Sequence, residues 1–140
     1  MKFLLFPHCF YPAKEGGSTT FTNLALGLKE NNQKVEVLTS NCPSSDYFFK
    51  KSYQNFIAGR SQHKGLEIFR LNTSKINQRF IVRLAKLTKL PFLAIIAKGP
   101  IFKNLGQIFK KRSIDWVIAG HFPLLTPFWA LLVAKRNQAK

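Results

Sequence analysis

The chain has 140 residues, 46% hydrophobic and 14% aromatic, which suffices for one domain with an apolar core and excludes a disordered segment. Its 22 Lys and Arg against 6 Asp and Glu give a net charge of +16, which favours phosphorylated small molecules, nucleic acid or an anionic membrane as partners. No stretch reaches the roughly 18–20 apolar residues of a membrane-spanning helix, so no span is expected.

The two cysteines and the first apolar run indicate in which cellular compartment the protein is expected. Cys9 and Cys42 form neither a CxxC pair nor a disulfide framework, so we expect free thiols in a reducing cytosol. The apolar run Phe3–Phe6 is ended by Pro7 and His8 and is too short for the core of a signal peptide. We therefore expect a cytoplasmic protein.

The first 40 residues predict a strand, a helix and a second strand. Lys2–Phe6 is a nearly continuous apolar run, typical of a strand buried on both faces of a parallel sheet. After a loop, a helix is expected from a cap at the Thr19-Thr20 pair to the Asn31-Asn32 pair. Lys34–Ser40 is alternating and β-branched, which predicts the second strand of a right-handed β-α-β crossover.

The rest of the chain predicts two more strands, with a long loop before them and helices between and after them. A loop over Asn41–Gly65, with a helical turn near Tyr47–Phe56, precedes a strand over Leu66–Leu71. A basic helical region follows from Ser74 or Asn77 to Arg112, with breaks at Pro91 and at Gly99-Pro100. The last two elements are a strand over Ile114–Ala119 and a helix over Thr126–Lys135. This order predicts a single α/β domain with a Rossmann-like, doubly wound, mostly parallel sheet. Ligands of such sheets bind at the carboxyl ends of the strands.

The loop sequence AKEGGSTTF, residues 13–21, follows the first strand. Glycines let a ligand approach the backbone, and the first amides of a helix carry partial positive charge, so a diphosphate is expected at Gly16 and Gly17. Further phosphate or acceptor contacts are expected from Lys14, Ser18, Thr19 and Thr20. The loop matches neither GxGxxG nor a Walker A sequence, and an ordinary turn with capping hydroxyls is the alternative.

The candidate catalytic residue is His121, at the end of the strand in IDWVIAGH. A histidine there can act as acid, base or hydrogen-bond donor, although it can equally be structural. His8 is a weaker candidate, and His63 is expected to be solvated. Glu15 has no obvious partner, and no metal-ligand spacing is present, so no metal is expected.

The region from Lys75 to Arg112 holds ten Lys and Arg residues and no acid. Apolar Ile76, Phe80, Leu84 and Leu87 have helical spacing with cations beside them, and a second amphipathic helix is expected in PIFKNLGQIFKKR. This pattern is typical of helices in an anionic membrane interface, the alternative being a core-facing stripe beside a solvated face. The cations expected to face the membrane are Arg79, Arg83, Lys86, Lys89, Lys103, Lys110, Lys111 and Arg112. No nucleic-acid-binding motif accompanies the charge, so nucleic acid is not expected.

Two stretches resemble a known family, the retaining GT-B glycosyltransferases of family four. The first stretch resembles the start of the family's N-terminal domain and consists of KFLLF, P-x-x-x-P-A-K-E-G-G-S-T-T-F and NLALGLKENNQKVEVLTS. In the family, this region reads close to F-P-P-x-x-G-G, followed by a helix and then by G-H-x-V-x-V-(I/L)-T. Gln33-Lys34 stands where the family has Gly-His. IDWVIAGHFPLLTPFWALLVAKR resembles the family's D-V-V-H-A-H-x-P strand and helix, with His121 in the place of the second His.

The resemblance implies roles for three residues. The backbone of Gly16 and Gly17 would meet the diphosphate of a nucleotide-sugar, and His121 would lie near the transferred sugar and its acceptor. It also implies a lipid-linked or glycan acceptor, basic helices on the inner membrane face and no cofactor beyond the donor substrate.

A GT-B enzyme has a second domain that carries most nucleotide contacts, and residues 1–140 match the acceptor-side domain only. We therefore expect a fragment, a split enzyme with a separate C-terminal half, or a remnant inactive alone. The alternatives are a non-catalytic basic α/β module that binds a membrane or partner subunit, and a nucleic-acid-binding protein.

Overall fold

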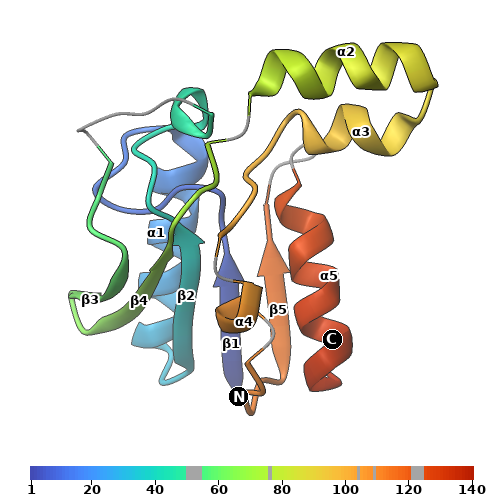
Figure 1. Ribbon diagram of the computed structural model, residues 1–140. Helices are drawn as coiled ribbons and strands as arrows, with labels where there is room; N and C mark the ends of the chain where they lie inside the picture. The colour runs from blue at the N-terminus through green and yellow to red at the C-terminus, as the bar shows by residue number, and fades with distance from the viewer. Residues whose placement is uncertain (50–54, 76, 104, 109, 121–124) are drawn as a thin grey trace.

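The computed structural model describes residues 1–49, 55–75, 77–103, 105–108, 110–120 and 125–140 (Figure 1). Its elements are β1 (Lys2–Phe6), α1 (Gly16–Glu30), β2 (Lys34–Ser40), the 3-10 turn η1 (Ser45–Tyr47), β3 (Gly59–His63), β4 (Leu66–Leu71), α2 (Gln78–Thr88), α3 (Pro91–Ile96), α4 (Leu105–Ile108), β5 (Trp116–Ala119) and α5 (Thr126–Asn137). The predicted α/β class is confirmed.

The five strands form one sheet in the order β3-β4-β2-β1-β5. β1, β2, β4 and β5 are parallel, and β3 pairs antiparallel with β4 at the edge. The winding reverses between β1 and β5, because the chain moves outward from β1 through β2 to β4 and then returns to the other side of β1. Such a reversal is the point where doubly wound sheets bind ligands.

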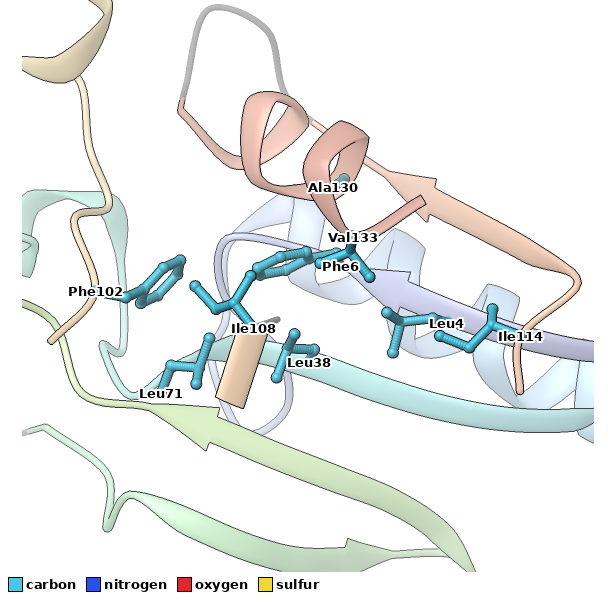
Figure 2. Close-up of a cluster of buried hydrophobic side chains, with 9 residues drawn as sticks. All are labelled: Leu4, Phe6, Leu38, Leu71, Phe102, Ile108, Ile114, Ala130 and Val133. Atoms are coloured by element: carbon cyan, nitrogen blue, oxygen red, sulfur yellow. The ribbon is translucent and has the colours of Figure 1, made fainter. Parts of the chain in front are cut away.

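Helices cover both faces of the sheet, and each face has its own core. On one face, Phe21 and Ala25 of α1 pack against Leu5 of β1 and Val37 of β2. On the other, side chains from β1, β2 and β4 meet those of α4 and α5 (Figure 2). Alternating side chains of β1 serve opposite faces, which explains its continuous apolar sequence.

The start of α1 differs from the prediction. The helix begins at Gly16, not at a Thr19-Thr20 cap, so both glycines of the loop lie in its first turn. Glu15 is the N-cap residue, but its side chain makes no capping hydrogen bond. The hydroxyl of Thr20 donates to the Gly16 carbonyl at 3.0 Å instead of capping.

The long loop predicted before the third strand contains β3, which was not expected. β3 and β4 form a hairpin whose turn residues, Lys64 and Gly65, have φ values of 47° and 71°. Two positive φ values match the right-handed twist of a two-residue hairpin. A helical turn was predicted near Tyr47–Phe56, and the 3-10 turn η1 ends at Tyr47. Residues 50–54 of that range lie outside the described residues.

The predicted second amphipathic helix was wrong. Among the described residues of this segment, only Leu105–Ile108 is helical, and Phe102 instead forms an isolated antiparallel bridge with Thr73. Phe102 and Ile108 are 3% and 0% exposed because both belong to the core over α5. Phe102 and Ile108 therefore pack into the core, whereas Leu105 is 40% exposed.

Candidate functional site at the carboxyl edge

The carboxyl ends of β1 and β5 lie side by side, with Phe6 paired to Ala119. The helices that follow them, α1 and α5, both begin at this edge and run back along the sheet (Figure 1). The partial positive charges of two helix N-termini are thus directed to the same end of the molecule. This arrangement suits an anionic ligand.

The two glycines of the predicted diphosphate site occupy the first turn of α1. Gly16 is exposed and Gly17 is half-buried. A Cβ placed on Gly16 would meet no atom within 4 Å, so the space beside its backbone is open. A ligand therefore has room to approach the first amides of the helix. Binding of a diphosphate there stays a prediction.

The polar residues beside the glycines divide into exposed and internal groups. Lys14 and Thr19 are exposed, and Thr19 donates weakly to the Glu15 carbonyl at 3.5 Å. Ser18 is buried, and its hydroxyl donates to the Ala13 carbonyl at 3.0 Å, which ties the loop to the helix. Lys14 and Thr19 are thus accessible among the predicted phosphate contacts, while Ser18 closes the loop.

The end of β5 reaches the first turns of α1. A Cβ at Gly120 would lie 2.2 Å from the ring of Phe21, so a glycine lets the strand end pass directly beside the helix. His121, the predicted catalytic residue, follows at position 121, and it and residues 122–124 lie outside the described residues. Its proximity to the glycine loop stays a prediction.

A buried histidine–glutamate pair holds the loop after β1 and was not predicted. His8 Nε2 lies 2.8 Å from Glu15 Oε2, and the His8 side chain is 4% exposed. The other carboxylate oxygen, Oε1, accepts hydrogen bonds from the N–H and the hydroxyl of Ser45 at 2.8 and 3.1 Å. The carboxylate of Glu15 therefore joins three loop segments at the carboxyl edge.

The same contacts set the charge state of Glu15. Partial burial raises the pKa of its carboxyl, but hydrogen bonds from Ser45 and His8 outweigh burial and hold the pKa below its usual value of 4.5. In contrast, burial and the charge of Glu15 both raise the pKa of the neighbouring Cys9 thiol. At neutral pH, Glu15 is thus ionised and Cys9 is protonated.

Replacing Glu15 with glutamine should lower the free energy of unfolding by on the order of 1.5–3 kcal/mol near neutral pH, since hydrogen bonds to a charged acceptor are lost. A depressed carboxyl pKa stabilises the fold above its ordinary value, and this contribution is lost as the pH falls through the folded pKa. The difference from wild type should therefore shrink below about pH 4.5. Urea denaturation near pH 7 and near pH 4 tests this, with exposed Glu67→Gln as control; a difference that does not change with pH contradicts it.

The carboxyl ends of β2 and β4 are closed by buried polar contacts. Asn41 Oδ1 accepts hydrogen bonds from the backbone and hydroxyl of Thr73 at 3.3 and 3.5 Å. Lys75 Nζ donates to Thr73 Oγ1 and to the Tyr47 carbonyl, both at 2.9 Å. Both cysteines are free, as predicted, and both are buried. Among the described residues at the β1–β5 side of this edge, the space beside Gly16 is open.

His63, predicted to be solvated, lies away from this edge on β3. Its ring stacks on Tyr11, with 3.6 Å between centroids. The carbonyl of Tyr11 in turn accepts a hydrogen bond from Arg70 Nη2 at 2.6 Å. His63 therefore packs the outer strand of the sheet against the loop after β1.

The pair α2–α3 projects beyond the carboxyl edge of the sheet (Figure 1). Within α2, Ile81 is buried, whereas Phe80 and Leu87 are 62% and 81% exposed. Exposed cations lie beside this apolar stripe, at Arg79, Arg83, Lys86 and Lys89. The alternative interpretation, in which the apolar stripe faces the protein core, is therefore wrong for Phe80 and Leu87.

The cations near the end of the basic region lie elsewhere. Lys110, Lys111 and Arg112 line a cavity of about 460 Å³ over the sheet face of Leu4 and Leu38. Arg112 is turned inward: its guanidinium donates to the carbonyls of residues 107, 108 and 110 and lies 3.8 Å from Glu36. The predicted membrane-facing cations therefore do not form one surface. Lys103 is exposed next to buried Phe102.

Comparisons with models of protein families, with curated proteins and with solved structures found no match to this chain. Across the described residues, every helix is too short or too polar to cross a lipid bilayer.

Proposed function

We propose that this chain is the acceptor-side domain of a retaining GT-B glycosyltransferase, binding the diphosphate of a nucleotide-sugar at the β1–β5 edge. The observation that carries the proposal is the position of Gly16 and Gly17: they form the first turn of α1 where the sheet reverses its winding. The open space beside Gly16 admits a phosphate oxygen to the backbone amides.

The chemistry follows from where charge develops. In glycosyl transfer, the bond between the sugar and the diphosphate breaks, a bond to the acceptor oxygen forms, and the leaving diphosphate gains negative charge. Helix amides and a nearby cation such as Lys14 stabilise that charge most strongly when they are held in place before the reaction. His121 is proposed to contact the sugar or the acceptor. A second domain is proposed to supply most nucleotide contacts, so binding by this chain alone should be weak and transfer should require both domains.

The membrane part of the proposal rests on α2. Its exposed phenylalanine and leucine side chains present an apolar surface, and the four cations beside it are exposed as well. This combination favours an interface with anionic lipid. The acceptor would then be lipid-linked or part of an envelope glycan, presented to the carboxyl edge from the same side. A non-catalytic module that only binds the membrane is the second candidate, because α2 needs no diphosphate site for docking.

Replacing Gly16 with valine should weaken binding of a nucleoside diphosphate by about tenfold or more, equivalent to about 1.4 kcal/mol. The valine Cβ would enter open space and meet no atom within 4 Å outside the adjoining backbone, so the fold should be kept. Gly27→Val is the matched control, because Gly27 also lies in α1 and a Cβ there meets nothing within 4 Å. Calorimetric titration of the three proteins measures the effect. Equal affinities for all three contradict the site, and absence of binding by wild type favours the non-catalytic candidate.

A further inference from the structure

Three metal-ligating side chains meet at the base of the loop after β1. The ligand atoms of His8, Cys9 and Glu15 all lie within 4.8 Å of one another. His8 and Cys9 are 3% and 0% exposed, and the Glu15 side chain is 28% exposed. The cluster is therefore enclosed on two sides and open to solvent at the carboxylate.

We propose that His8, Cys9 and Glu15 form a binding site for a divalent transition-metal ion of the zinc type. Imidazole nitrogen, thiolate sulfur and carboxylate oxygen are the three ligand types that zinc accepts together in proteins. Three protein ligands leave a fourth position of a tetrahedral ion, which a water molecule takes at the partly exposed Glu15 side.

The supporting contacts hold the ligands in place. Glu15 Oε1 is occupied by the N–H and hydroxyl of Ser45, which leaves Oε2 directed at His8. Cys9 Sγ lies 3.8 Å from Ser40 Oγ, and Ser40 in turn donates to the His8 carbonyl at 2.5 Å. Partners of this kind orient metal ligands and are part of a working site. Two of the ligands, His8 and Cys9, come from the loop after β1, and the third, Glu15, is the N-cap residue of α1.

Metal binding requires small and defined changes. His8 Nε2 and Glu15 Oε2 are 2.8 Å apart, whereas two ligands of a tetrahedral zinc ion lie roughly 3.3–3.8 Å apart. The pair must therefore separate by about 1 Å or less. The Cys9 thiol releases its proton to solvent, and Nε2 presents its lone pair to the ion instead of a hydrogen bond to Glu15.

The second cysteine provides a contrast within the same molecule. Cys42 is buried like Cys9, but its Sγ lies 3.3 Å from Thr73 Oγ1 and 3.8 Å from Lys75 Nζ. An ammonium group already occupies the space beside this sulfur, which disfavours a metal cation. Cys42 packs in the same buried cluster as Cys9, so Cys42→Ser removes a neighbouring buried thiol while all three proposed ligands are kept.

Titration of the full 140-residue chain with cobalt(II) tests the site, since cobalt adopts zinc geometries and its thiolate bond absorbs near-ultraviolet light. We expect about one ion per chain and a thiolate charge-transfer band. The band should vanish in Cys9→Ser and persist in Cys42→Ser. Glu15→Gln should weaken affinity by more than the roughly 10- to 100-fold that loss of a supporting partner costs.

Several results would overturn the proposal. These are a folded wild-type chain without the band, a band that survives Cys9→Ser, and Glu15→Gln affinity equal to that of wild type. Circular dichroism of each variant verifies folding, and Glu15→Gln gives an independent answer if Cys9→Ser does not fold. Because Gly16→Val leaves all three ligands in place, failure of the diphosphate site and failure of the metal site are separate results.

Discussion

Neutralising four cations on and beside α2 should reduce binding to anionic vesicles about 1,000-fold, because each cation near such a surface contributes about 1 kcal/mol. The four residues to be replaced with glutamine are Arg79, Arg83, Lys86 and Lys89. All four are exposed beside the apolar stripe of Phe80 and Leu87, so their removal should leave the core intact. Sedimentation with vesicles containing phosphatidylserine measures the loss.

A matched variant separates local from general charge effects. It carries four neutral replacements among exposed cations at the other end of the sheet, at Lys34, Lys64, Lys135 and Arg136. Its net charge equals that of the α2 variant, yet its binding should fall much less. Equal losses in the two variants would show that the overall charge of +16, and not α2, determines binding. Replacing Leu87 with serine should weaken binding further, since its side chain is 81% exposed.

Replacing Phe6 with alanine is expected to lower the free energy of unfolding by about 3–5 kcal/mol. Its ring is fully buried and stacks on Phe102, with 5.9 Å between centroids. Figure 2 shows Phe6 among side chains that come from β1, β2, β4, α4 and α5. The loss is a large part of the roughly 5–15 kcal/mol by which most domains are stable.

The effect should extend to the candidate site, because Phe6 is the last residue of β1 and the loop with His8 follows directly. Urea denaturation of wild type and variant measures the change. Leu131→Ala on α5 is the control: its side chain is 52% exposed, so its cost should stay within about 0.5 kcal/mol. A loss below about 1 kcal/mol for Phe6→Ala would contradict the assignment of this core.

The parallel strands could be predicted because their sequences carry the burial pattern. Lys2–Phe6, Lys34–Ser40 and Leu66–Leu71 were predicted with the bounds observed. β5 begins two residues later than predicted, at Trp116, and α5 ends two residues later, at Asn137. Strands buried between helices need apolar side chains in nearly every position, and this requirement is visible in sequence.

The elements that were predicted wrongly depend on contacts between segments far apart in the sequence. β3 is polar and lies at an edge, so its sequence, GRSQH, has no apolar alternation to indicate a strand. Phe102 and Ile108 had helical spacing, but the bridge to Thr73 and the core over α5 decide their structure. Tertiary packing overrode the local pattern in this segment.

The candidate site was predictable in part. The glycine loop could be placed at a strand end because strand, loop and helix follow one another directly in the sequence. The His8–Glu15 pair could not be predicted, because it forms only when the loop folds back and Ser45, from a separate segment, contacts Glu15. The two residues are seven positions apart in a loop, where no regular spacing exists to indicate a contact.

Titration with a nucleoside diphosphate, followed through the backbone amide resonances, tests whether this ligand binds at the first turn of α1. The amides of Gly16, Gly17 and Ser18 should shift most, because a diphosphate accepts hydrogen bonds from the start of this helix. The largest shifts in the cavity beside Lys110 and Arg112, with those of Gly16 and Gly17 unchanged, would contradict it.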